Sequence, residues 1–137
     1  MLQSRTIGIA IGKPWKDVYE RIWRPESFPK WASGLSRSSL VKVGDGWTAE
    51  GPAGTVRIRF TDHNAFGVMD HYVDAGTGSQ IYIPLRVIAN AEGAEVLLTL
   101  FQQPGMSEQQ FLTDAKWVER DLVALKALLE GVGSLHP

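Results

Sequence analysis

His71 is the side chain with the clearest capacity for acid–base chemistry, because an imidazole changes its protonation state near neutral pH. Residues 55–61 alternate between apolar and charged side chains, which predicts a strand with one buried face. A four-residue hairpin loop within residues 62–67 would place His71 on the same buried face of the following strand. The pairs that this register predicts are Arg59 with Asp70, Ile58 with His71, and Phe60 with Met69.

Two roles for His71 follow from this position, and the sequence leaves both open. In an apolar cavity, a neutral imidazole can act as the general acid or base of a cyclisation or dehydration. That role requires help from Tyr82 or Asp114, which would have to converge with His71 on one cavity. The alternative is a histidine that hydrogen-bonds a neighbour and fills space in the core.

Other chemistries find little support in the residue types and their spacing. The chain has no cysteine, which excludes disulfides, thiolate metal sites and a cysteine nucleophile. His63 lies in a predicted turn and His136 in the C-terminal tail, so the three histidines show no metal-ligand spacing. No glycine-rich segment leads into a helix as a phosphate-binding loop must. We therefore expect no metal and no other cofactor.

Composition predicts one globular domain over residues 1–137. A hydrophobic content of 44% is ordinary for such a domain, and a formal net charge of -1 argues against a nucleic-acid partner. The N-terminal region has no apolar run long enough for a signal peptide or a membrane span. We therefore expect a cytoplasmic protein that does not span a membrane.

The element around which the rest is arranged is a long helix predicted over residues 107–131. Ser107 is suited to cap its first turn together with Gln110, and Gly131 is suited to end it. Six apolar side chains recur every three or four residues and form one narrow stripe. They are Phe111, Ala115, Val118, Leu122, Leu125 and Leu129. Such a stripe needs one continuous apolar surface to pack on.

A seven-stranded antiparallel sheet is the surface that the remaining residues predict. A strand over residues 4–12 precedes two short helices, the first led by Pro14 and the second spanning residues 26–33 and closing at Gly34. Six further strands follow as a meander. They span residues 40–43, 47–50, 55–61, 68–74, 80–89 and 95–102. The fold class is therefore α+β.

The last hairpin has a register that the aliphatic residues determine. The predicted pairs are Ala89 with Ala94, Val87 with Val96, Leu85 with Leu98, and Ile83 with Leu100. The reverse face of this hairpin carries Tyr82, Arg86 and Phe101, and it is open as a solvent face, a homodimer contact or a pocket wall. The register between the fifth and sixth strands is undetermined, so Tyr82 and Arg86 are not assigned to the face of His71.

The order of elements resembles the START/Bet v 1-like (SRPBCC) superfamily over essentially the whole chain. Two segments carry the resemblance: the opening KPWKDVY with the later PE and PKW, and the close PGMSEQQFLTDAKWVERDLVALKALLE, which resembles uncharacterised bacterial polyketide cyclase/dehydrase-like proteins. The resemblance implies the helix-grip fold, in which a curved sheet wraps a long C-terminal helix. Members bind lipids, sterols, hormones or polyketides, catalyse cyclisation or dehydration, or act as co-chaperones, so the site must decide function.

We expect a small hydrophobic or aromatic ligand between the long helix and the sheet, because a strongly curved sheet does not close fully onto one helix. The residues predicted to line the site are Trp31, Ile58, Phe60, Met69, His71, Val73, Tyr82, Arg86, Phe111, Asp114 and Trp117. One alternative is a polyketide cyclase/dehydratase-like enzyme with His71 as its catalytic residue. Another is a protein resembling the Hsp90 activators, which would contact its partner through Tyr82 and Phe101.

Overall fold

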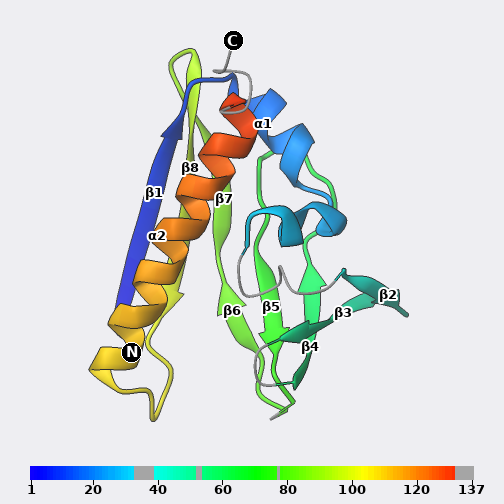
Figure 1. Ribbon diagram of the computed structural model, residues 1–137, viewed down its shortest axis with the longest axis vertical. Coiled ribbons are helices and arrows are strands. Elements are labelled where there is room, and N and C mark those ends of the chain that lie inside the picture. Colours follow the sequence, from blue (N-terminus) through cyan, green and yellow to red (C-terminus); the bar gives the residue numbers. More distant parts are fainter. Residues whose placement is uncertain (33–38, 52–53, 77, 132–137) are drawn as a thin grey trace.

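A computed structural model describes residues 1–32, 39–51, 54–76 and 78–131 (Figure 1). The elements are β1 (Ser4–Ile11), α1 (Trp15–Ile22), the 3-10 helix η1 (Pro25–Lys30), β2 (Val41–Val43), β3 (Gly46–Gly51), β4 (Gly54–Phe60), β5 (His71–Asp74), β6 (Ile81–Ile83), β7 (Leu85–Asn90), β8 (Gly93–Phe101) and α2 (Glu108–Glu130). The architecture is α+β, with α2 packed on a curved antiparallel sheet. The predicted end of the second short helix, at residues 33 and 34, lies outside the described residues.

The helix α2 begins and ends where its sequence predicts. The hydroxyl of Ser107 accepts a hydrogen bond from the backbone N–H of Gln110 at 3.0 Å, and Gly131 adopts the left-handed conformation at φ 68°. The side-chain amide of Gln110 donates to Asp114 at 2.8 Å, and within the described residues its oxygen accepts no hydrogen bond from the Ser107 N–H, so the capping box is not completed. The apolar stripe faces the interior: Phe111, Ala115, Leu122, Leu125 and Leu129 are buried, and Val118 is partly buried.

The C-terminal end of α2 is fixed to the first strand by charged side chains. Glu130 accepts hydrogen bonds from the backbone N–H of Gly12 and from the ammonium of Lys126, both at 2.8 Å. Lys126 also donates to the carbonyl of Ala10 at 2.6 Å. In the described part of the chain, no side-chain hydrogen bond joins residues 108–119 of α2 to a strand. The two halves of α2 are therefore held differently.

Within the described residues, the sheet has eight strands in two hydrogen-bonded groups, not the seven strands that the sequence predicts. One group has the order β1-β8-β7 and the other the order β2-β3-β4-β5-β6. The additional strand arises because the predicted strand over residues 80–89 is interrupted at Pro84, which has no backbone N–H to donate to a ladder. The interruption separates β6 from β7 and divides the sheet.

Residues 67–69, which precede β5, join the two groups of strands by pairing with β7. Val68 forms an isolated bridge with Arg86, and the backbone N–H of Met69 donates to the carbonyl of Leu85 at 2.8 Å. The N–H of Val87 donates to the carbonyl of Gly67 at 2.9 Å. Because this contact lies between a short bridge segment and β7, it lets the sheet bend without losing its hydrogen bonds.

The predicted register between β4 and β5 is wrong by two residues. Arg59 lies opposite Tyr72 and not Asp70, and the other observed pairs are Ile58 with Val73 and Phe60 with His71. The connection is longer than a four-residue loop because Asn64 organises it. The Asn64 side chain accepts hydrogen bonds from the N–H groups of Phe66 and Val68 and donates to the Val68 carbonyl. A shift of two residues preserves the face of every side chain, so His71 still points inward.

The last hairpin has the predicted register from Leu85 with Leu98 to Ala89 with Ala94. The predicted pair of Ile83 with Leu100 lies beyond the end of this ladder, where the carbonyl of Pro84 accepts from the N–H of Thr99. Figure 1 shows α2 lying over β1 and β8, to one side of β4 and β5. The inner face of β4 and β5 is instead contacted by η1, through Phe28.

Gly67→Ala tests the junction between the two groups of strands. Gly67 has φ 71°, and an added Cβ would lie 2.3 Å from the carbonyl oxygen of Val87. We expect a loss of about 3 kcal/mol in the free energy of unfolding, measured by urea denaturation, because the left-handed strain adds to a backbone clash. The matched control is Gly44→Ala, at φ 63° with open space, which should lose only about 1 kcal/mol. Equal losses in the two variants would contradict the junction.

Candidate functional site

His71 is the one buried polar or charged side chain among the described residues, with 6% of its surface exposed. It lies on the inner face of β5, and its neighbours are aromatic. The ring of Phe28 from η1 meets it edge-on with centroids 5.5 Å apart, and the ring of Phe60 from β4 lies 5.6 Å away. On this inner face, the His71 imidazole is therefore surrounded by apolar side chains.

The hydrogen bond of His71 determines which of its nitrogens carries the proton. Nδ1 lies 3.1 Å from the carbonyl oxygen of Met69. A carbonyl can only accept, so Nδ1 is the donor and, in the neutral ring, Nε2 holds a lone pair. Burial lowers the pKa of His71 below its ordinary value, although the bond to Met69 and the charge of Asp70 oppose that shift. His71 is therefore a neutral imidazole at neutral pH, with Nε2 as an acceptor.

Trp31 closes the same aromatic group at the end of η1. Its ring lies 5.4 Å from that of Phe28, and 5% of the residue is exposed. The Nε1–H of Trp31 is the only fully covered polar side-chain atom without a hydrogen bond among the described residues. An unmade hydrogen bond of this kind costs about 1–3 kcal/mol.

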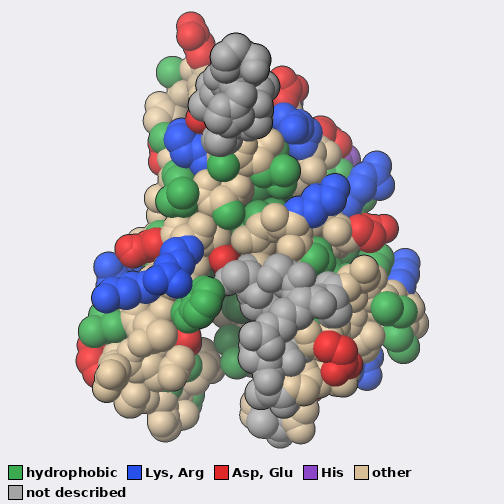
Figure 2. Space-filling model, viewed as in Figure 1, with side chains coloured by type: hydrophobic (Ala, Val, Ile, Leu, Met, Phe, Trp, Pro, Cys, Tyr) green, Lys and Arg blue, Asp and Glu red, His purple; other side chains and the backbone are tan. Residues whose placement is uncertain are grey.

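Apolar side chains on both sides of the interior remain only partly buried. Val73, Ile83 and Leu100 from the sheet and Val118 from α2 pack against the core, yet each keeps accessible surface. We use the name central hollow for the interior region between α2 and the inner face of the sheet that these side chains face. Figure 2 shows the molecular surface recessed beside the N-terminal half of α2, with hydrophobic side chains at the floor of the recess. Phe111 is buried near the start of α2 but does not join the contiguous core cluster.

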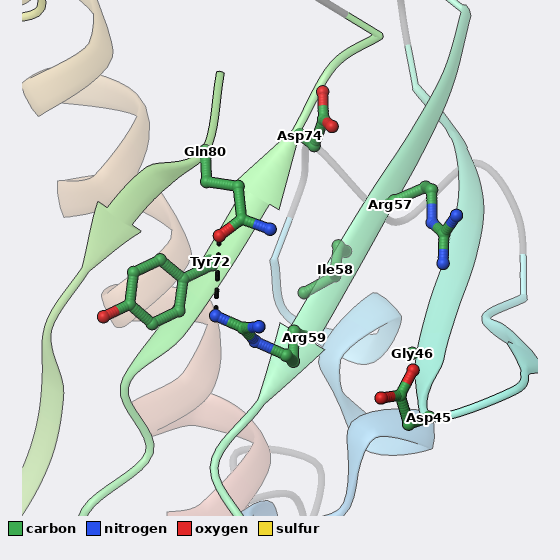
Figure 3. A pocket seen from close by; sticks show the side chains of 8 residues that line it. All are labelled: Asp45, Gly46, Arg57, Ile58, Arg59, Tyr72, Asp74 and Gln80. Carbon is green, nitrogen blue, oxygen red and sulfur yellow. Dashed lines mark hydrogen bonds between the residues drawn. The ribbon is translucent and has the colours of Figure 1, made fainter. Parts of the chain in front are cut away.

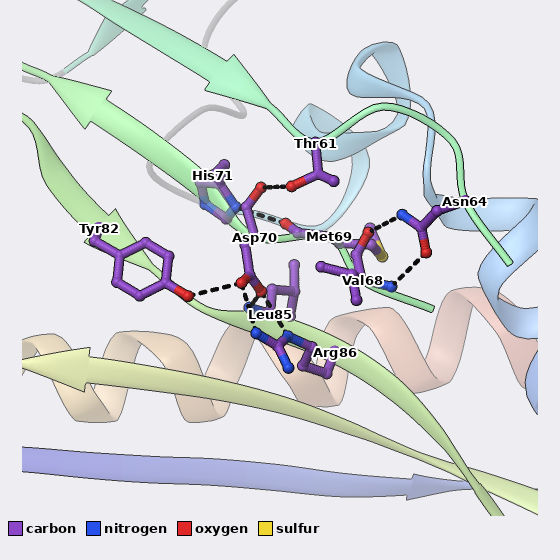
Figure 4. A network of polar contacts seen from close by, with 9 residues as sticks. All are labelled: Thr61, Asn64, Val68, Met69, Asp70, His71, Tyr82, Leu85 and Arg86. Carbon is purple, nitrogen blue, oxygen red and sulfur yellow. Dashed lines mark hydrogen bonds and ion pairs between the residues drawn. The ribbon is translucent and has the colours of Figure 1, made fainter. Parts of the chain in front are cut away.

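The outer face of the sheet carries a polar network centred on Asp70 (Figure 4). Arg86 donates to both oxygens of this carboxylate, from Nε at 2.8 Å and from a terminal nitrogen at 2.7 Å. The hydroxyl of Tyr82 donates at 2.7 Å, and the backbone N–H of Leu85 at 2.9 Å. Figure 4 shows the side chains of Asp70 and His71 pointing to opposite sides of the strand.

The protonation states of this network follow from its hydrogen bonds. Burial opposes ionisation of Asp70, but the donors Arg86, Tyr82 and the Leu85 N–H outweigh it and hold the pKa of the carboxyl below its ordinary value. The pKa of Tyr82 is raised because its hydroxyl donates to the carboxylate. The pKa of Arg86 is likewise raised, by its hydrogen bonds to Asp70. The network thus holds a fixed ion pair and a neutral phenol.

Aromatic rings continue this outer face from strand to strand. Tyr72 stacks on Tyr82 with centroids 5.2 Å apart, and Tyr82 stacks on Phe101 at 6.2 Å. The guanidinium of Arg59 lies 4.9 Å from the centre of the Tyr72 ring. Figure 3 shows Arg59 and Tyr72 beside a polar cavity of about 280 Å³, in which Asp45 and Asp74 accompany Arg57 and Arg59. Side chains of both charge signs therefore line this cavity.

His63 forms a second polar contact, which the sequence did not indicate. Its Nε2 lies 2.6 Å from Glu20 of α1, and its ring stacks on Tyr19 at 5.4 Å and lies 4.7 Å from that of Trp23. Two surface cavities of about 470 Å³ each border His63. The sequence pattern placed His63 in a solvated turn, because a contact between residues 43 positions apart leaves no local signal. Within the described ranges, no group of three acidic or histidine side chains could hold a metal ion.

Comparisons with known proteins agree with this architecture. No family model and no curated protein sequence matches the chain. A START superfamily protein from Mycobacterium smegmatis has a similar structure, with a TM-score of 0.73, 6% identity and coverage of 94% of this chain and 98% of that one. The protein Ara h 8.0201 matches with a TM-score of 0.67, 13% identity and coverage of 96% of this chain and 99% of that one. The chain has the START/Bet v 1-like fold.

A protein described as having two domains is also similar. It is the di-domain ARO/CYC BexL from the BE-7585A biosynthetic pathway, with a TM-score of 0.71 and 17% identity. The match covers 99% of this chain and 48% of BexL.

Among the helices of the described residues, none combines the length and the apolar character that a membrane span requires.

Within this START/Bet v 1-like fold, the predicted site residues separate into three groups. Ile58, Phe60, Met69, His71, Val73 and Trp31 lie on the inner side, together with the buried Phe111. Tyr82 and Arg86 lie on the outer face with Asp70, so Tyr82 does not converge with His71. Asp114 is bound to Gln110 of its own helix, and Trp117 is 48% exposed beneath the guanidinium of Arg120. Neither Tyr82 nor Asp114 is hydrogen-bonded to His71, whose one hydrogen bond within the described residues goes to Met69.

Asp70→Asn tests the outer network. The amide cannot accept all four donors, and it removes the charge opposite Arg86, so we expect a loss of about 2–3 kcal/mol in the free energy of unfolding. Asp74→Asn, at the end of the strand that follows Asp70, is the matched control, because its remaining carbonyl can still accept from the N–H of Gly76. Its loss should stay within about 0.5 kcal/mol. Urea denaturation that gives equal losses would contradict the role of Asp70.

His71→Leu tests the burial of a neutral imidazole through pH. The pKa of His71 is lowered in the folded protein from 6.5, so below pH 6.5 the unfolded chain binds a proton that the folded protein does not. The stability that His71 contributes is thus present above pH 6.5 and is lost as the pH falls toward its folded-state pKa. The unfolding free energy of wild type minus that of His71→Leu should fall on acidification from about pH 7.5 to about pH 5, because only wild type loses this stability. A constant difference over that range would show that His71 is not buried in the neutral form.

Proposed function

We propose that the protein binds a small hydrophobic or aromatic molecule in the central hollow and does not transform it. The observation that carries this proposal is the partial burial of Val73, Ile83, Leu100 and Val118, which face the interior from both the sheet and α2. A core closed by side chains alone would leave such residues with almost no accessible surface. An apolar ligand between α2 and the sheet would remove this surface from water.

The way α2 is held supports the same proposal. Its C-terminal half is fixed by Lys126 and Glu130 against β1, whereas its N-terminal half borders the hollow without such bonds. Open space beside the N-terminal half of α2 therefore leaves the hydrogen bonds of its C-terminal half intact. Ligand sites are typically apolar concavities with few polar groups, and His71 is the one buried polar side chain among the described residues.

The apolar surface of a small ring ligand limits the affinity that such a site could give. A bicyclic aromatic molecule that buries about 200 Å² of apolar surface gains about 5 kcal/mol from the hydrophobic effect. Loss of translational and rotational freedom reduces this gain, so affinities for unsubstituted rings should lie in the millimolar to micromolar range.

A carrier or binding role is favoured over a cyclase-like one. Among the described residues, the one hydrogen bond of His71 goes to the backbone of Met69, and the hydroxyl of Tyr82 is on the other face. General acid–base catalysis usually needs a second group to orient or accept the proton. An interaction role that uses Tyr82 and Phe101 on the outer face stays a prediction, as does a homodimer through that face.

Val118→Trp tests the proposed hollow. The larger ring should fill the space beside α2 and weaken binding of 2-methylnaphthalene, measured by equilibrium dialysis, by about tenfold or more. Val123→Trp is the matched control, because Val123 lies on the same helix and is 60% exposed. That variant should bind like wild type.

A second variant that fills the hollow keeps the test valid if Val118→Trp does not fold. Val73→Phe approaches the same space from β5 and should also weaken binding, while circular dichroism shows a folded protein. Unchanged affinity in both folded filling variants, or equal loss in Val123→Trp, would contradict a ligand between α2 and the sheet.

A further inference from the structure

We propose that the central hollow prefers an uncharged ring ligand that carries a hydroxyl group, with the hydroxyl donating a hydrogen bond to Nε2 of His71. This inference rests on the proposed function, since it names the chemistry of the ligand that the hollow would hold. It follows from the hydrogen-bond partners of one side chain and from the residues that surround it.

The direction of the hydrogen bond is set by the backbone. Met69 offers a carbonyl oxygen 3.1 Å from Nδ1, and this oxygen has no hydrogen to give. Nδ1 must therefore carry the hydrogen of the neutral ring, and Nε2 is left with a lone pair that can only accept. A ligand hydroxyl complements this lone pair, whereas an ether or carbonyl oxygen would face it with a second lone pair.

Nε2 is open to a ligand. No hydrogen bond to Nε2 occurs within the described residues, where His71 bonds through Nδ1 alone. The only fully covered polar side-chain atom without a partner there is Nε1 of Trp31, so Nε2 of His71 is not fully covered. Trp31 is the weaker candidate for a ligand contact for the same reason, since its N–H has no accessible surface.

The surroundings of His71 favour a neutral ligand. The side chains that face it from η1 and β4 are Phe28 and Phe60, and Ile83 lies opposite it on β6. None of these titrates. The nearest charge, Asp70, is next in the chain, but it points to the outer face and is paired with Arg86. An anionic ligand would therefore be desolvated here without a cation to compensate it.

The effect of one such bond can be stated as a ratio of affinities. A hydrogen bond between neutral groups contributes about 0.5–1.5 kcal/mol net, which corresponds to about threefold to tenfold in the dissociation constant. The ratio of dissociation constants should lie nearer tenfold than threefold, because the aromatic side chains around His71 exclude water from the hydrogen bond.

Three bicyclic probes of similar shape test this inference on the full chain at neutral pH. They are 2-naphthol, which can donate, 2-methoxynaphthalene, which can only accept, and 2-methylnaphthalene, which does neither. Equilibrium dialysis should show 2-naphthol binding about threefold to tenfold more tightly than the other two. In His71→Leu, this preference should disappear, because leucine offers no lone pair to a ligand hydroxyl.

His63→Leu is the matched control, because His63 lies beside two other cavities and not on the inner face of β5. It should retain the full preference for 2-naphthol. Loss of the preference in His63→Leu but not in His71→Leu would overturn the inference, since it would place the hydroxyl at the surface cavities. A preference that survives in both variants, or is absent from wild type, would also overturn it.

Acidification provides a test that needs no variant, should His71→Leu fail to fold. Once His71 is protonated, Nε2 becomes a donor, so 2-methoxynaphthalene should gain on 2-naphthol. This change in the ratio of affinities should appear only below pH 6.5, because burial lowers the pKa of His71. A ratio of affinities that does not change with pH would overturn the inference. Failure of 2-methylnaphthalene to bind wild type would instead contradict the proposed function itself.

Discussion

The carboxylate of Asp70 is the constraint on which the rest of the structure depends. It lies where Pro84 interrupts the sheet, and it accepts the backbone N–H of Leu85, the first residue after the interruption. Arg86 and the hydroxyl of Tyr82 complete its hydrogen bonds. A side chain thus replaces ladder hydrogen bonds at the point where two groups of strands meet. Removal of water from so many donors is tolerable only because one ionised group accepts all of them.

This arrangement determines the inner face as well as the outer one. Successive side chains of a strand point to opposite faces, so fixing Asp70 outward directs His71 inward. The bend at Pro84 leaves β1 and β8 beneath α2, while β4 and β5 are contacted by η1 through Phe28. The central hollow lies between these two packing units. Its one buried imidazole and its apolar walls therefore follow from the same break in the sheet.

Much of this fold could be predicted from the sequence, because the decisive signals are local. The stripe of α2 and its end residues Ser107 and Gly131 lie within one helix, and the last hairpin is determined by facing aliphatic residues. Pro84 also indicates a strand break, since proline is disfavoured inside a strand, but the alternating apolar residues on both sides of it favour one continuous strand. The interior position of His71 survived an incorrect register, since an error of two residues leaves the face unchanged.

The remaining features depend on contacts between distant residues. The long connection before β5 is organised by Asn64 and by the hydroxyl of Tyr19, which accepts from the Asn64 backbone N–H at 2.9 Å. The pairing of Asp70 with Arg86, and of His63 with Glu20, likewise arises only when separate elements meet. Whether Tyr82 shared the face of His71 could not be derived from the pattern, because the interruption at Pro84 separates the two ladders.

The central claim is that a ligand lies between α2 and the inner face of the sheet. The most direct measurement is of nuclear Overhauser effects between 2-methylnaphthalene and the valine and alanine methyl groups of selectively labelled protein. A ligand in the central hollow should give effects to both Val118 of α2 and Val73 of β5. Effects to Ala65, beside the surface cavity at His63, in place of these two valines would contradict the claim.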